Sequence, residues 1–178
     1  MAKVNCGMRS TSAPVRLKPP TARCPGTQEG DLLLGSGKGA IATLVERSSR
    51  LTVLVRLPNG RSSEPVLAAL TERIVSLPQQ LVRSLTWNQG KEMALHAQFT
   101  IDTGLQICIC DPRSPWQRGT NENTNGLLRQ SFPKGTNLNA VAQAELDAVA
   151  AELNGRPRQT LGWRSPSQTF AEAVAMTA

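Results

Sequence analysis

Two acidic residues of this sequence are placed where a carboxylate could take part in chemistry. Asp31 stands in the short apolar run GDLLLG, and an acid inside an apolar strand is unusual when it is unpaired. Glu122 stands in NENTNGLLRQ, at the start of a predicted helix. Both also have structural explanations. Asp31 follows Gly30 and could belong to a turn, and Glu122 could be a first-turn acid favoured by the helix dipole.

Basic and aromatic residues surround Glu122 in the sequence. The loop DPRSPWQRGTN brings Arg113, Trp116 and Arg118 close together. Such a loop can cradle phosphates and stack on a base, although Trp116 could equally pack on the sheet edge. Arg129 lies seven positions after Glu122, two helical turns along the same face, and is otherwise a solvated helix arginine.

The elements that must position these residues follow from hydrophobic periodicity and from turn residues. We expect strands over 31–35, 40–50, 51–57, 84–88 and 105–111, and helices over 62–78, 91–104, 121–132, 138–154 and 165–177. A three-stranded meander followed by alternating helices and strands predicts an α/β fold, with a mixed sheet flanked by helices.

Composition and charge favour a basic, nucleic-acid-binding chain. The net charge is +7, and residues 1–29 hold five Lys/Arg against one Glu. Residues 1–28 are rich in Pro, Ser, Thr and Arg, so we expect a flexible basic arm before a single domain over 29–178. No apolar run reaches membrane-spanning length, and the N-terminus lacks the apolar region of a secretory signal. A cytoplasmic location is the default expectation.

The four cysteines, Cys6, Cys24, Cys108 and Cys110, do not predict a metal centre. Cys108 and Cys110 lie two apart in QICIC, on one face of an expected strand. A metal pair is one interpretation, but the spacing is not typical of zinc and no second pair follows at a suitable distance. We therefore predict that both are small core residues.

Several long motifs together carry a family resemblance. DPRSPWQRGTNENTNGLLRQSFPKGTNL, with GDLLLG and TLVERSSR before it and LNGRPRQTLGW after it, closely resembles the DDE transposases of the insertion-sequence-thirty family over residues 25–172. The resemblance implies a ribonuclease-H-like, retroviral-integrase-type fold with a mixed five-stranded sheet. It also implies DNA cleavage and strand transfer with magnesium, by a homo-oligomer assembled on transposon ends and target DNA.

The resemblance assigns roles to individual positions. Asp31 matches the first of three metal-binding carboxylates and Glu122 matches the third, whereas Asn88 stands where the second should be an Asp. Thirty-three residues separate Asn88 from Glu122, as the family pattern requires. Arg129 occupies an offset from which a basic residue contacts the DNA end, and Asn123 would orient a ligand or serve as a helix-start polar group. We expect Asp31, Asn88 and Glu122 to converge at one edge of the sheet.

The asparagine decides between the functions that remain open. Two magnesium ions about 3.5–4 Å apart clamp the attacking and leaving oxygens of such a reaction, and carboxylates offset their charge. Asn88 offers one neutral carbonyl oxygen instead, and Glu92 is the nearest acid that could partly replace it. The sequence also has no counterpart of the family's N-terminal helix-turn-helix. The hypotheses are therefore an impaired transposase core and a catalytically dead DNA-binding or multimerising fragment; a ribonuclease-H-like nuclease is disfavoured by the same asparagine.

Overall fold

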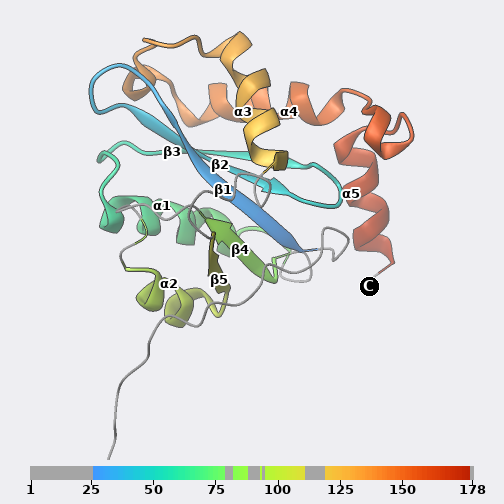
Figure 1. The fold of residues 1–178 in the computed structure, drawn as a ribbon, viewed down its shortest axis with the longest axis horizontal. Coiled ribbons are helices and arrows are strands. Elements are labelled where there is room, and N and C mark those ends of the chain that lie inside the picture. Colours follow the sequence, from blue (N-terminus) through green and yellow to red (C-terminus); the bar gives the residue numbers. More distant parts are fainter. Residues whose placement is uncertain (1–25, 79–81, 88–92, 94, 111–118, 177–178) are drawn as a thin grey trace, which may run out of the picture.

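The computed structural model describes residues 26–78, 82–87, 93, 95–110 and 119–176 (Figure 1). Within them the strands are β1 (Thr27–Leu34), β2 (Ala40–Glu46), β3 (Thr52–Arg56), β4 (Ser84–Trp87) and β5 (Gln106–Ile109). The α-helices are α1 (Ser63–Val75), α2 (His96–Thr103), α3 (Gly119–Ser131), α4 (Gln143–Gly155) and α5 (Pro166–Ala175). Two short 3-10 helices, η4 (Leu138–Ala140) and η5 (Gln159–Leu161), lie on either side of α4.

The five strands form one mixed sheet in the order β3-β2-β1-β4-β5. The meander β1, β2 and β3 is antiparallel, whereas β4 pairs in parallel with both β1 and β5. In the β1–β4 register, Gly30 is the Cα partner of Trp87. The predicted mixed five-stranded sheet flanked by helices is confirmed, and β1 is its central strand.

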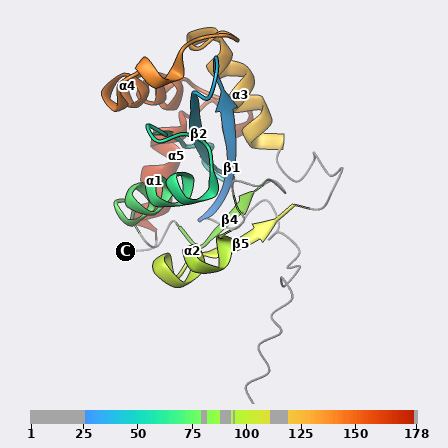
Figure 2. The same cartoon turned by 90° about the vertical axis from the view of Figure 1, so that its left-hand side faces the viewer.

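Helices cover both faces of the sheet and produce two cores. α1 and α2 lie against one face and α3 and α4 against the other (Figures 1 and 2). The first core joins the sheet to α1 and to Phe99 of α2, with Trp87 and Leu85 of β4 at its centre. The second core joins Leu33 and Ile41 to side chains of α3, η4 and α4. This second face also carries Glu29 and Asp31, which alternate with Gly30 along β1.

Several predicted ends of helices and strands agree with the structure to within one residue. α1 starts at Ser63, α2 ends at Gly104 in the left-handed conformation with φ 68°, and α5 is capped by Ser165. The Ser165 cap is reciprocal: its side chain accepts from the Gln168 amide, and the Gln168 side chain accepts from the Ser165 amide. β1 begins at Thr27, inside the stretch predicted to be a flexible arm.

The prediction of one continuous helix over residues 138–154 is wrong at its start. Leu138–Ala140 forms the 3-10 helix η4, the next two residues are extended with ψ of 127° and 155°, and α4 begins at Gln143. Leu138 and Val141 are both buried, and their three-residue spacing suits a 3-10 turn as well as an α-helix. The hydrophobic pattern therefore does not distinguish the two structures.

None of the helices that the structure describes is long and apolar enough to cross a bilayer.

Candidate active site

Strand β1 presents two carboxylates on the face of the sheet that α3 covers. Side chains of a strand alternate between the two faces, so Glu29, Asp31 and Leu33 share one face. Leu33 packs into the second core, Glu29 is buried, and Asp31 is half-buried. The sequence analysis selected only Asp31. The signal that identifies Glu29 is its position two residues earlier in the same strand.

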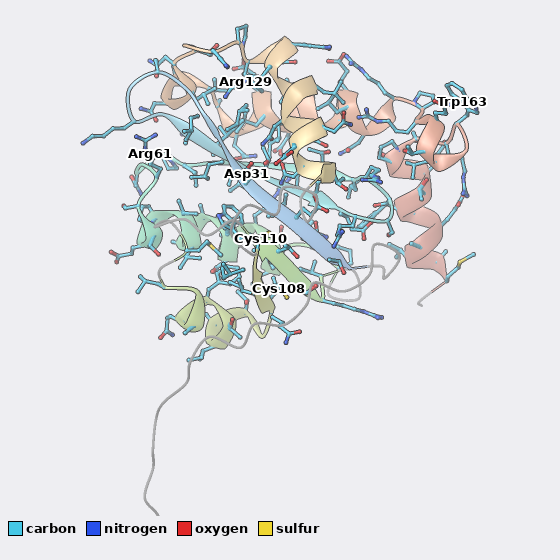
Figure 3. The ribbon with its side chains drawn as sticks, viewed as in Figure 1. Asp31, Arg61, Cys108, Cys110, Arg129 and Trp163 are labelled. Carbon is cyan, nitrogen blue, oxygen red and sulfur yellow. The ribbon has the colours of Figure 1, made fainter. Side chains whose placement is uncertain are left out.

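Asp31 is held by hydrogen bonds from its own strand and from α3. Its Oδ1 accepts from the Leu32 amide at 2.9 Å, and its Oδ2 accepts from Nδ2 of Asn125 at 3.2 Å. The contact with Asn125 links the middle of the central strand to the position three residues after Glu122 in α3. Figure 3 shows Asp31 beside the N-terminal half of α3. Asn125 is a second residue that the sequence analysis did not select.

Asn121 fastens the start of α3 to the two central strands. It is fully buried, its amide donates to Oε2 of Glu29 at 2.9 Å, and its Nδ2 donates to the Glu29 carbonyl at 2.8 Å. The Thr43 hydroxyl donates to Oδ1 of Asn121 at 2.9 Å, and Nδ2 also reaches the Thr43 carbonyl at 3.3 Å. The first turn of α3 is thus fixed relative to both β1 and β2.

Glu122 directly follows this anchor and is exposed in the first turn of α3. Residues 122, 125 and 129 lie on one side of an α-helix, because three- and four-residue steps return to the same face. The bond between Asn125 and Asp31 shows that this side of α3 faces β1. The structure therefore places Asp31 against Asn125, on the helix face that also bears Glu122.

Glu29 is a buried acid close to the positive charges of Arg47 and Arg50. Burial raises the pKa of its carboxyl above the ordinary value, while the Asn121 amide, then Arg47 and Arg50, oppose this increase. Arg47 Nε lies 2.9 Å from Oε1 of Glu29, and both side chains are shielded, with 12% and 1% of their surface exposed. Glu29 therefore serves as a structural counter-ion and helix anchor in this fold.

Four of the predicted site residues lie outside the described residues: Asn88, Arg113, Trp116 and Arg118. Position 88 follows Trp87 in the chain, and Trp87 is the register partner of Gly30, the residue before Asp31. Glu92, the expected substitute acid, also lies outside the described residues.

Asn123 and Arg129 both follow Glu122 in α3. The Arg129 guanidinium donates to the Leu34 carbonyl at 3.0 Å and to the Phe132 carbonyl at 3.4 Å, so it is held at the end of β1 (Figure 3). Asn123 is exposed and lines a cavity that also contains Glu29 and Arg47. The two residues therefore lie toward opposite ends of the helix.

Cys108 and Cys110 are buried core residues, as the sequence predicts. Both are free thiols with at most 5% of their surface exposed, and burial raises the pKa of Cys108. In the described part of the chain, no group of three or more His, Cys, Asp or Glu residues is arranged to hold a metal ion.

Comparison with known proteins identifies close relatives of this core. No protein-family model matches the chain. It is 54% identical over 155 residues to transposase InsI of insertion sequence element IS30A from Escherichia coli (strain K12), which covers 87% of the chain and 40% of that protein. It is 49% identical over 165 residues to the transposase of IS1086 from Cupriavidus metallidurans, covering 90% of the chain and 48% of the relative. The chain thus spans less than half of these relatives.

Solved structures share the fold at low sequence identity. The catalytic core domain of BIV integrase superposes with a TM-score of 0.64 at 17% identity, covering 86% of this chain and 99% of that domain. A chain of the simian T-cell lymphotropic virus intasome, solved in complex with PP2A regulatory subunit B56 gamma, gives a TM-score of 0.64 at 16% identity, covering 83% of this chain and 56% of its own. The fold is therefore that of integrase catalytic cores, as the sequence predicts.

Proposed function

Because the chain belongs to the insertion-sequence-thirty family of transposases, we propose that it is a core for metal-dependent DNA cleavage and strand transfer, impaired by Asn88. The observation that carries this proposal is the link between β1 and α3, in which Asn121 and Asn125 bind Glu29 and Asp31. That link supports a site in which the acid of a central strand faces an acid of the neighbouring helix. We expect the chain to act in the cytoplasm, to bind DNA, and to form a homo-oligomer on that DNA.

Magnesium is the expected metal. The available side chains are of the type that binds magnesium, but they are fewer than the three carboxylates that the family resemblance implies. Carboxylate oxygens are the hard ligands that Mg²⁺ prefers, and Asp31 and Glu122 supply two carboxylates. When bound, a pair of such ions would stabilise the charge on the attacking and leaving oxygens of a phosphodiester. The role of the chain is to hold its carboxylates in place. The hydrogen bond from Asn125 to Oδ2 limits the rotation of the Asp31 carboxylate.

Asn88 is expected to weaken this site. An asparagine carbonyl cannot bridge two cations as a carboxylate can, so the site has one negative charge fewer than in an active relative. The lost stabilisation of the transition state is about 3–5 kcal/mol, which corresponds to a rate lower by roughly several hundred- to several thousand-fold.

DNA contacts are expected on both sides of the acid positions. We assign phosphate and base contacts to Arg113, Trp116, Arg118, Asn123 and Arg129. Binding should be largely independent of DNA sequence and should weaken steeply as salt rises, because contacts to phosphates carry no sequence information. A titration of labelled duplexes at two salt concentrations tests this expectation, and strong preference for one short sequence would contradict it.

The deciding experiment restores the second acid. Nicking and strand transfer on a pre-cut DNA end, with magnesium or manganese, are compared for the chain as it stands, Asn88→Asp, and Asn88→Asp combined with Glu122→Ala. Asn88→Asp should bind magnesium more tightly and react faster, and the added Glu122→Ala should abolish the gain. Equal rates for the chain and Asn88→Asp would mean that another residue supplies the second ligand, with Glu92 and Asp111 the first to test.

The same asparagine favours a second function, a catalytically inactive fragment that binds DNA or joins transposase multimers. In that case the chain and Asn88→Asp would both fail to nick DNA, yet both would bind it. Mixing the chain with an intact family transposase and measuring transposition then tests whether it interferes.

A further inference from the structure

Three arginines from two separate segments line one cavity at the start of α3. Arg47 and Arg50 belong to the turn between β2 and β3, and Arg158 immediately precedes η5. The cavity has a volume of about 400 Å³, and Thr120 and Thr160 contribute hydroxyl groups to its wall. In Figure 1 the β2–β3 turn and the first turn of α3 lie side by side.

The positive charge in this cavity exceeds the negative charge. Glu29 is the one acid among the lining residues that the structure describes, and it is paired with Arg47. Arg50 donates to the Thr120 hydroxyl and Arg158 donates to a backbone carbonyl, so neither of these bonds involves an anion. In the described part of the chain, the buried Nε of Arg158 has no hydrogen-bond partner.

Arg158 also has the electrostatic character of an uncompensated cation. Burial, and then the neighbouring positive charges of Arg156 and Arg50, lower the pKa of its guanidinium. Like charges gathered in a partly shielded place are costly unless an anion joins them. The geometry and the charge therefore both favour an anionic ligand.

We propose that this cavity binds a backbone phosphate of DNA beside the active site. The inference rests on the proposed function and adds a contact to it that the sequence motifs do not reveal. Guanidinium groups form paired hydrogen bonds with phosphate oxygens, and hydroxyls such as those of Thr120 and Thr160 donate to them as well. Asn123, next to Glu122, lines the same cavity.

The cavity and Arg129 lie toward opposite ends of α3. Thr120 lies at one end of α3 and Arg129 near the other, a separation of about 13 Å at 1.5 Å per residue. Phosphates of one DNA strand recur every 3.4 Å along the duplex axis, so about four steps span this distance. Nine residues are about two and a half turns of an α-helix, so Thr120 and Arg129 lie on opposite sides of α3, and the cavity and Arg129 would contact different parts of a bound DNA.

Charge-neutralising variants test the contact through binding alone. Arg50→Gln and Arg158→Gln are compared with Arg61→Gln, which removes the same charge from an exposed residue before α1 (Figure 3). The probe is a fluorescein-labelled duplex of arbitrary sequence, titrated from about 50 to about 200 mM salt. Each cavity variant should weaken low-salt binding roughly three- to tenfold and reduce the log–log salt slope by about 0.9, more than Arg61→Gln does.

A second pair of variants avoids buried residues and so guards against misfolding. Thr160 and Gln159 are both exposed, but only Thr160 lines the cavity. Thr160→Glu should weaken DNA binding clearly more than Gln159→Glu. Equal effects within both sets of variants would overturn the proposal. It would also be overturned if the cavity variants lost binding to an acidic peptide or to RNA while their binding to DNA stayed unchanged.

Failure of this proposal is distinguishable from failure of the proposed function. If Asn88→Asp nicks DNA but the cavity variants bind like their controls, the phosphate site alone is wrong. If the cavity variants lose DNA binding while Asn88→Asp remains inert, the phosphate site stands and the proposed catalysis is wrong.

Discussion

The two faces of strand β1 are built in different ways although their residues alternate along one chain. On the α1 side, Gly30 lies against the ring of Trp87, which is fully buried in an apolar core. On the α3 side, Glu29 and Asp31 are held by hydrogen bonds from Asn121 and Asn125. At Gly30 the packing depends on shape, whereas at Glu29 and Asp31 it depends on the pairing of polar groups beside the second apolar core.

The difference separates what stabilises the fold from what orients the site. Apolar burial contributes about 25 cal/mol per Å², so the Trp87 face supplies much of the stability. A buried hydrogen bond contributes only about 0.5–1.5 kcal/mol net, but leaving its partner unpaired costs about 1–3 kcal/mol. The hydrogen bonds of Glu29 and Asp31 therefore add little stability of their own, yet they fix α3 in one position on the sheet.

The largest expected effect is on the apolar face. A Cβ on Gly30 would overlap the Trp87 ring and lie 3.2 Å from Cδ1 of Leu85, and neither buried side chain can move aside easily. Gly30→Ala should lower the free energy of unfolding by about 3 kcal/mol, as overpacking of a core does. Urea denaturation measures the change.

Gly126→Ala is the matched control for this prediction. A Cβ at Gly126 meets no atom within 4 Å, and the residue lies inside α3. The same substitution should here raise the free energy of unfolding by about 0.5–1 kcal/mol. Equal effects at the two glycines would show that Trp87 does not pack against β1 as described.

The second effect is on the polar face. Asn121→Ala removes the three hydrogen bonds of the side chain and leaves carbonyl groups of Glu29 and Thr43 without their side-chain donor. The Asn121 backbone amide survives the substitution, so we expect a loss of about 2–3 kcal/mol in the free energy of unfolding. Asn123→Ala, at an exposed position of the same helix turn, should change stability by less than about 0.5 kcal/mol. Equal stability of the two variants would contradict the anchoring role of Asn121.

The order of the elements could be predicted from sequence because each element carries a local signal. The repeated apolar residues of α1, the left-handed Gly104 and the Ser165 cap are all readable within a few positions. The break before α4 could not be read, because Leu138 and Val141 have a spacing that two helix types share.

The site itself was only partly predictable, because its network is not local. Asp31 and Glu122 could be selected from motifs, but the bond from Asn121 to Glu29 joins residues 92 positions apart. That bond exists only once α3 has docked on the sheet. The arginine cavity is similar, since Arg50 and Arg158 come together only in the folded chain. Charge counts reveal an excess of arginine without revealing which arginines meet.

A smaller effect on the polar face concerns the orientation of Asp31. Asn125→Ala removes the donor to Oδ2 of Asp31, and Asn125 is only half-buried. The free energy of unfolding should fall by about 1 kcal/mol. In the Asn88→Asp background, magnesium should bind roughly threefold to tenfold more weakly, since the carboxylate is no longer held. Calorimetric titration with magnesium measures this, and unchanged affinity would show that Asn125 has no positioning role.

The smallest expected effect lies on neither face, in the turn after α4. Trp163 has 71% of its surface exposed and a φ of 67°, in the left-handed region that L-residues avoid. Its ring supports no core, so its influence on stability should act through the backbone. Trp163→Gly should be more stable than Trp163→Ala by about 0.5–1 kcal/mol, because only glycine adopts this φ without strain. Thermal unfolding of the two variants side by side measures the difference. If Trp163→Gly is instead much less stable than the parent chain, the exposed ring stabilises the fold. The turn around Trp163 would then be a third stabilising region beside the two faces of β1.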